Sequence, residues 1–273
     1  MSPNEEVPEL ALDLGTYDRP NITNVGTASH LFDKGLRLLL AYQHEEAGKA
    51  FQECVRVSND CALAHALIAL AHSPNYNFNG VDFYEASREI QEFSKDKRLS
   101  QEVMYEYPSK FLASYHSQEA VKIVENLALK GRRRKNKKFH ATQLSPISNV
   151  EAMIIRAVRT LNSNLNVDSS IAEKLNGRPF GNEMRKVYQK HPEDPEVAYF
   201  YAGSLMNLNA WNLYDYPTQT PLSNDVPKVK KVLEDSLLIH PNHVGLCHMY
   251  IHLCEMSPNP EKALNACDVL RER

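Results

Sequence analysis

One spacing of small and large residues recurs near both ends of this chain, and it constrains the fold more than any other feature. The intervals are twelve and sixteen residues, from Gly35 to Ala47 and Phe51 and again from Ile251 to Ala263 and Cys267. Ala69 lies thirty-four residues after Gly35, so the pattern also repeats at a fixed period. Self-similarity of this kind predicts a stacked repeat architecture, in which each unit buries its apolar face against its neighbours.

The apolar residues follow a helical period through most of the chain. The expected helices cover residues 27–42, 45–57, 83–93, 100–116 and 118–129, a further one follows Asn59 and Asp60, and helices resume near Gly181. Ser148 and Glu151 indicate a capping box, and Asp194 with Pro195 indicates another helix start. Only 10 glycines occur and strand-like alternation is hard to find, so we expect an all-α chain.

Four short strings carry a resemblance to known proteins: HEEA at 44–47, PNYN at 74–77, MNL at 206–208 with Trp211, and HMYIH at 248–252. With the spacing above, the chain resembles the tetratricopeptide repeat (TPR) superfamily over about residues 27–95 and 180–273, and in particular a set of larger TPR proteins of mostly unknown function. Lys34 and Asn59 depart from the consensus. The resemblance implies a right-handed α-α superhelix of stacked TPR-like hairpins with irregular insertions, whose concave groove binds a partner.

We therefore expect four segments along the chain. They are an extended lead-in at 1–25, N-terminal TPR-like helices at 26–95, an irregular helical insert at 96–147 with a basic loop at 131–145, and C-terminal TPR-like helices at 148–273. In the last segment, Val229 and Leu233 follow Gly203 by 26 and 30 residues, where 12 and 16 would be regular. A loop insertion at 211–224 accounts for the difference of fourteen residues.

His248, His252 and Glu255 are the sharpest candidates for chemistry. Separations of four and seven residues place them on one face of a helix. Two imidazoles and a carboxylate could hold a divalent transition metal, as in a two-histidine, one-carboxylate site. In the register that the resemblance implies, these positions face the concave groove, Asn207 faces it from the preceding repeat, and Trp211 begins the inserted loop beside it.

A plainer interpretation of the same residues is recognition without a metal. Glu255 would then pair with His252 one turn away, a gain of about 0.2–0.5 kcal/mol, and the histidines would hydrogen-bond a bound peptide. The zinc-protease spacing HExxH, a Gly-rich phosphate loop and a nucleophile elbow are all missing from the sequence. We expect a protein-interaction module or scaffold with no cofactor and no catalytic residue; the alternative is a metal-binding protein or metal-dependent enzyme.

Composition narrows the partners and the compartment. A formal net charge of −3 gives no general attraction to nucleic acid or anionic membranes. No run of about 18 apolar residues occurs, so no transmembrane helix is expected. The five cysteines form no CxxC pair and the acidic N-terminus lacks a secretory signal, so we expect a cytoplasmic protein. The basic run from Arg132 to Lys138 leaves a nuclear protein as the alternative.

Overall fold

The computed structural model describes residues 16–77, 109–135, 147–162 and 169–272. The α-helices in these ranges are α1 (Ser29–Leu40), α2 (His44–Val57), α3 (Ala62–Ala71), α6 (Ser109–Lys135), α7 (Asn149–Leu161), α8 (Ser169–Lys190), α9 (Pro195–Met206), α10 (Val226–Ile239), α11 (Val244–Cys254) and α12 (Leu264–Arg271). Short 3-10 helices are η1 (Gly26–Ala28), η3 (Asn207–Asn209) and η4 (Pro260–Ala263). An isolated antiparallel bridge joins Tyr214 and Pro221 in the loop before α10. The all-α prediction is confirmed for the described part of the chain.

Local sequence signals explain where several helices begin. The backbone N–H of Glu151 donates to the Ser148 hydroxyl, and the Glu151 carboxylate accepts from the Ser148 N–H, so the predicted capping box is confirmed. Asp194 caps α9 by accepting a hydrogen bond from the Val197 N–H, and Pro195 takes the first helical position. Each cap gives a partner to a backbone donor that the first turn leaves unpaired.

Two helices extend beyond their predicted limits. α6 runs through the expected break at Ser117, whose hydroxyl donates to the Ser114 carbonyl inside the helix, and it ends at Lys135 within the predicted basic loop. Arginine and lysine are good helix formers and are favourable at a helix C-terminus, which explains the extension. α8 begins at Ser169 and not near Gly181. The predicted helix at 83–93 and residues 136–145 of the basic loop lie outside the described residues.

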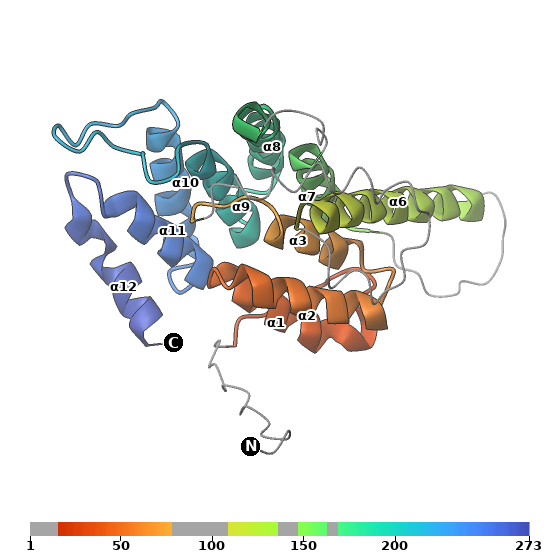
Figure 1. Cartoon of the computed structure of the whole chain (residues 1–273). Coiled ribbons are helices and arrows are strands. Elements are labelled where there is room, and N and C mark those ends of the chain that lie inside the picture. Colours follow the sequence, from red (N-terminus) through yellow and green to blue (C-terminus); the bar gives the residue numbers. More distant parts are fainter. Residues whose placement is uncertain (1–15, 78–108, 136–146, 163–168, 273) are drawn as a thin grey trace, which may run out of the picture.

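Consecutive helices pack on one another along the chain, and α9 also contacts α11, two helices further on (Figure 1). Stacked helical hairpins produce this pattern of contacts. The small-to-large spacing marks one of the closest approaches. A Cβ added to Gly35 of α1 would lie 2.8 Å from the ring of Phe51 on α2, so glycine is what lets the two helices meet there.

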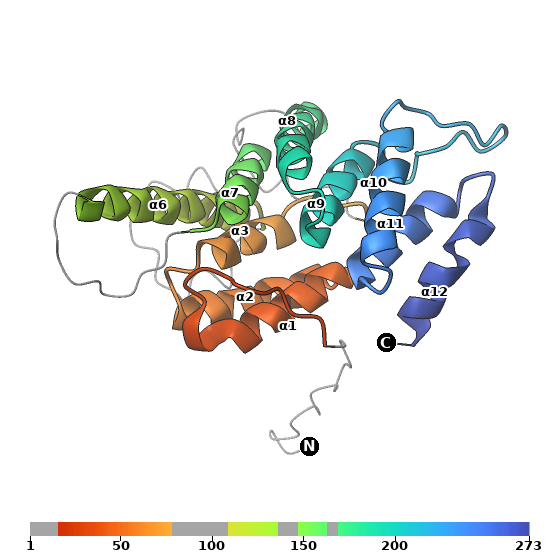
Figure 2. The same cartoon turned by 180° about the vertical axis from the view of Figure 1, so that it is seen from behind.

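The N-terminal hairpin also contacts the C-terminal part of the chain, because α1 contacts α11 (Figures 1 and 2). Gly245, in the first turn of α11, allows this approach, since a Cβ there would lie 2.6 Å from the Leu40 Cδ2 atom. The Tyr42 hydroxyl donates to the Met249 sulfur at 3.1 Å, which joins the α1–α2 turn to α11. The N-terminal hairpin therefore covers part of the α11 surface that was predicted to face an open groove.

Residues 16–25, expected as an extended lead-in, are fastened to α9 by buried charges. Arg19 forms ion pairs with Asp194 and Glu196, and the Tyr17 hydroxyl also donates to Glu196. The His243 Nε2 atom lies 3.4 Å from the Glu196 Oε1 atom, the same oxygen that accepts from Tyr17. Burial alone would raise the pKa of Glu196, but its bond with His243 and the charge of Arg19 outweigh burial and hold that pKa below its usual range.

Candidate functional site

The structure brings four of the five predicted groove residues together on the second half of α11 and the loop before α10. The Nε2 atoms of His248 and His252 are 3.1 Å apart, and their ring centroids are 4.9 Å apart. The Trp211 ring lies 5.5 Å from the His252 ring, nearly edge-on. Glu255 is the C-cap of α11, and its Oε1 atom lies 2.8 Å from the His252 Nδ1 atom. Asn207, the fifth residue, is the C-cap of α9.

The predicted metal set of His248, His252 and Glu255 does not converge on one point. His252 turns Nε2 toward His248 and Nδ1 toward the carboxylate, so Glu255 sits on the opposite ring nitrogen from the histidine pair. A carboxylate on the outer nitrogen fixes the tautomer and orientation of an imidazole. Among the described residues, no group of three His, Cys, Asp or Glu side chains is placed to hold a metal ion. Glu255 therefore acts as an orienting partner of His252.

Three further side chains belong to this site, and the sequence analysis did not place them there. Tyr42 comes from the turn between α1 and α2, His44 is the first residue of α2, and Tyr76 follows α3. The Tyr42 ring lies 4.6 Å from the His248 ring and 5.0 Å from the His44 ring. The Tyr76 ring lies 4.9 Å from His252 and 5.3 Å from Trp211. The available signal was that His44 and Tyr76 lie in the strings at 44–47 and 74–77 that carry the resemblance. We call the seven residues together the histidine–aromatic cluster: Tyr42, His44, Tyr76, Trp211, His248, His252 and Glu255.

Two aromatic residues of the histidine–aromatic cluster have strained backbones. Tyr42 has a φ of 62° and Trp211 a φ of 58°, in the left-handed region that bulky side chains rarely adopt. Tyr42 occupies the position after the end of α1 where glycine is usual, and the N–H of Gln43 bonds back to the Leu38 carbonyl at 2.9 Å. A residue held this way costs on the order of 1–3 kcal/mol, and such residues concentrate at functional sites. The rings of Tyr42 and Trp211 both contact histidines of α11.

Burial keeps three imidazoles in and beside the histidine–aromatic cluster neutral near pH 7, those of His44, His72 and His248. Burial lowers the pKa of His44 to about 4, and the neighbouring His248 and His72 lower it too. The pKa of His248 is also lowered to about 4, by burial and then by His252, against a hydrogen bond with the Leu40 backbone. Neither ring nitrogen of His44 has a hydrogen-bond partner among the described residues. Buried polar atoms without partners are rare in native proteins and call for an explanation.

The part of the histidine–aromatic cluster that a partner can reach is small and specific. Trp211 is 55% exposed, the Glu255 side chain is 37% exposed, and the His252 side chain is 12% exposed. The Asn207 Oδ1 atom, at the start of the same segment as Trp211, is buried without a hydrogen-bond partner in the described chain. The accessible surface thus combines an indole face, a carboxylate and one edge of an imidazole over a packed floor of tyrosine and histidine rings.

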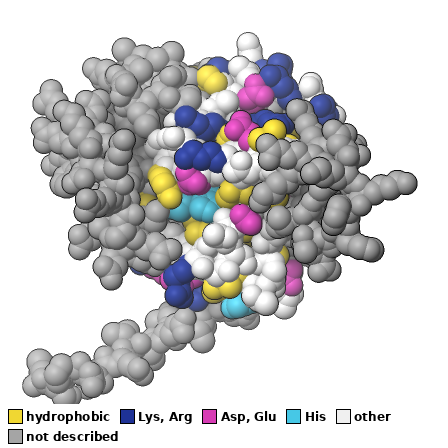
Figure 3. Space-filling view, turned by 90° about the vertical axis from the view of Figure 1, so that its right-hand side faces the viewer, with side chains coloured by type: hydrophobic (Ala, Val, Ile, Leu, Met, Phe, Trp, Pro, Cys, Tyr) yellow, Lys and Arg dark blue, Asp and Glu magenta, His cyan; other side chains and the backbone are white. Residues whose placement is uncertain are grey.

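The described part of the face in Figure 3 carries side chains of both charges. On the face in Figure 3, basic and acidic side chains are interspersed with hydrophobic ones, so its described part shows no basic stripe for a phosphate backbone. Residues 132–135 of the basic run continue α6, and the rest of that run lies outside the described residues. Within the described ranges, no helix combines the length and the apolar character that crossing a bilayer requires.

Comparison with known proteins adds no relative to this description. No protein-family model, no curated protein and no solved structure matches the chain.

Proposed function

We propose that this chain is a protein-interaction module, built of TPR-like hairpins in a right-handed superhelix, and that its histidine–aromatic cluster binds a segment of a partner protein. The stacking of consecutive helices and the close contact of Gly35 with Phe51 support the TPR-like arrangement. Arrays of helical hairpins commonly present extended binding surfaces, which supports a binding role. The docked N-terminal hairpin narrows the binding surface to the exposed side of the cluster.

The observation that carries this proposal is the state of Trp211, the single tryptophan of the chain. It is 55% exposed, yet its backbone is strained and its ring contacts both Tyr76 and His252. An indole left half in water gains little from burial, so its packing alone does not account for the strain. Tryptophan is enriched among the residues that dominate interface energies, and a rigid ring loses little entropy on binding.

The side chains around Trp211 indicate the chemistry of the partner segment. An apolar or aromatic side chain fits the exposed indole face. Glu255 offers a carboxylate for a lysine, an arginine or a backbone N–H of the segment, and its bond to His252 holds it in place. We therefore expect a short segment that carries an apolar anchor next to a basic residue.

The test uses peptides displayed on phage and selected on the whole chain, followed by measurement of their Kd from Trp211 fluorescence or from fluorescence polarisation. Trp211→Ala is the test variant, read by polarisation. Tyr216→Ala is the matched control, because Tyr216 is an aromatic residue of the same loop and is 93% exposed. We expect Trp211→Ala to weaken the selected peptides by about tenfold or more, as hot-spot truncations do, with no change for Tyr216→Ala. Peptides that bind Trp211→Ala as tightly as the native chain would refute the assignment of this site.

One specific contact favours a second candidate, a bound divalent transition metal. The Nε2 atoms of His248 and His252 are 3.1 Å apart, and Glu255 occupies the outer nitrogen of His252 in the way that orients metal-bound histidines. These side chains supply two ligands, so water or the partner would complete the coordination. Metal analysis of the purified protein tests the idea: stoichiometric zinc, copper or nickel, lost with a lower Tm on chelation, would support it. Metal-free protein whose Tm is unchanged by added zinc would remove it.

A further inference from the structure

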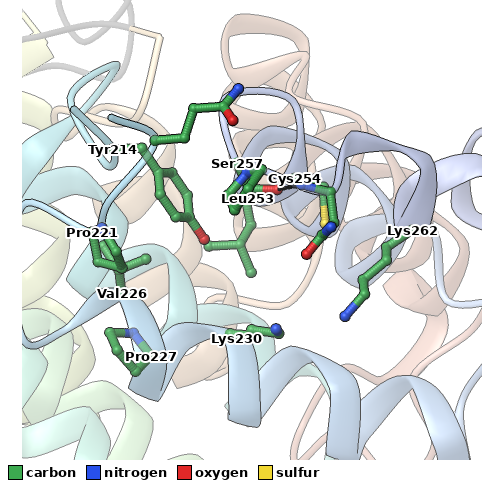
Figure 4. A pocket seen from close by; sticks show the side chains of 12 residues that line it. Tyr214, Pro221, Val226, Pro227, Lys230, Leu253, Cys254, Ser257 and Lys262 are labelled. Carbon is green, nitrogen blue, oxygen red and sulfur yellow. Dashed lines mark hydrogen bonds between the residues drawn. The ribbon is translucent and has the colours of Figure 1, made fainter. Parts of the chain in front are cut away.

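A cavity of about 260 Å³ lies apart from the histidine–aromatic cluster, between α10, the end of α11, the segment leading into η4 and the loop before α10 (Figure 4). Its floor and sides are largely apolar and include Tyr214, Val226 and Leu253. Tyr214 and Leu253 are buried in the core, so these walls are fixed in place. Such a surface favours a ligand with a compact apolar body.

Two ammonium groups enter this cavity from different elements. Lys230 comes from α10 and Lys262 from η4, and Figure 4 shows both side chains reaching the same space. The residues that line the cavity include no aspartate or glutamate. Lys262 has no ion pair within the described chain, while Glu234 lies 4.0 Å from Lys230 at the margin of ion-pair distance. The lining therefore carries a local excess of positive charge.

The thiol of Cys254 shows that the two charges act on one point. Burial and the charge of Glu234 raise the pKa of Cys254, while a hydrogen bond with Tyr250 and the charges of Lys230 and Lys262 lower it. Both ammonium groups must lie within electrostatic range of that thiol, which is itself part of the wall. Two cations from separate elements that face one largely apolar space are an arrangement suited to a single anionic group.

The loop that forms one wall is held in shape by its own hydrogen bonds. The Thr218 hydroxyl donates to the Asp215 carboxylate at 2.5 Å, and the Leu222 N–H donates to the Leu213 carbonyl at 2.9 Å. Gln219, which lines the cavity, has a φ of 54° between these bonds. A wall fixed in this way lowers the entropy lost when a ligand binds.

We propose that this cavity binds a small organic anion, a carboxylate or a phosphate monoester, with its charge between Lys230 and Lys262 and its apolar body against Tyr214 and Leu253. The volume lies below the roughly 300–1,000 Å³ of pockets for drug-sized ligands, so the ligand is a small molecule and not a peptide. The proposal does not depend on the partner-binding role of the histidine–aromatic cluster.

Isothermal titration calorimetry on the whole chain tests the proposal with three probes that share one ring: phenyl phosphate, benzoate and neutral phenol. We expect saturable binding of at least one anion and none of phenol, and the preferred anion separates the phosphate class from the carboxylate class. Lys230→Met and Lys262→Met keep the aliphatic stem and remove the charge, and each should weaken the preferred anion by about fivefold or more. Lys231→Met is the matched control, since it lies on the same helix with a side chain that is 77% exposed and paired to Asp235.

The outcomes separate this cavity from the histidine–aromatic cluster. Trp211→Ala should leave anion binding unchanged, and Lys262→Met should leave the selected peptides bound. No detectable binding of either anion at millimolar concentration would overturn the proposal. Equal affinity in the native chain and in the double variant Lys230→Met with Lys262→Met would overturn it as well.

Discussion

Acid should destabilise this protein well before its carboxylates protonate, because several buried histidines resist protonation in the folded state. The pKa values of His44, His72 and His248 are each lowered to about 4 from 6.5, chiefly by burial. The unfolded chain therefore takes up a proton on each of these histidines between pH 6.5 and pH 4, while the folded chain does not. Because the unfolded state binds more protons in this window, the free energy of unfolding must fall as the pH falls through it.

The size of the effect follows from the same shifts. A pH of 5.0 lies 1.5 units below the pKa of 6.5 that each of these imidazoles has in the unfolded chain. At about 1.36 kcal/mol per unit, protonation of the unfolded chain lowers the free energy of unfolding by roughly 2 kcal/mol for each histidine. Three such residues give at most about 6 kcal/mol, which is a large share of the roughly 5–15 kcal/mol that stabilises a typical domain. Glu196 does not contribute in this window, because its lowered pKa makes its stabilisation disappear only below about pH 4.5.

Urea unfolding followed by circular dichroism at pH 7.5 and pH 5.0 measures this loss. The variant His44→Gln removes one titrating ring, so its loss of stability between the two pH values should be smaller than that of the native chain by about 2 kcal/mol. His30→Gln serves as the control, because His30 is an exposed residue of α1 and its replacement should leave the native loss intact. The reasoning is refuted if His44→Gln loses as much stability as the native chain, or if the native chain loses none.

Three further predictions concern close contacts and strain. Gly245→Ala should destabilise the chain by about 1–3 kcal/mol in the same urea titration, because the added Cβ would overlap the docked N-terminal hairpin. Gly203→Ala should instead stabilise the chain by up to about 1 kcal/mol, because its added Cβ would lie 3.6 Å from the nearest atom. Arg19→Met should cost roughly 3–5 kcal/mol, since it leaves Glu196 buried without its main cation, and an unchanged Tm would contradict that account. Trp211→Gly removes backbone strain as well as the indole, so the free energy of unfolding of this variant should stay within about 1 kcal/mol of the native value while its affinity for the peptides falls. A larger loss of stability would mean that Trp211 serves mainly to pack the fold.

The helix starts could be predicted from the sequence because their signals are local. The caps at Ser148 and Asp194 depend on residues within three positions, and the structure confirms both. The limits of α6 and α8 were harder, since polar residues such as Ser117 are compatible with a helix when their hydroxyls bond within it. α8 also continues through Gly177 and Pro179, residues that usually mark a break in a helix, so their signal was misleading there.

The candidate site could be predicted only in part, because half of it depends on contacts between distant segments. His248, His252 and Glu255 share one helix, so their spacing was sufficient to group them. Tyr42 joins them across about two hundred residues, through the docking of α1 on α11. No feature of one sequence indicates that Gly245 is the point where Leu40 approaches, since a glycine in a first helical turn has many possible causes.

The docking of α1 on α11 and the proposed binding of a partner involve the same residues of the histidine–aromatic cluster. Tyr42 covers His248 in the closed chain, so the partner can reach only the outer members of the histidine–aromatic cluster. A change that loosens the docking without touching the cluster should uncover that imidazole. Gly245→Ala is such a change, and we expect it to speed the modification of His248 by diethyl pyrocarbonate, measured by mass spectrometry of the peptide that contains α11. Gly203→Ala should leave the rate unchanged. Equal rates in both variants and in the native chain would mean that the contact between α1 and α11 does not control access to the site.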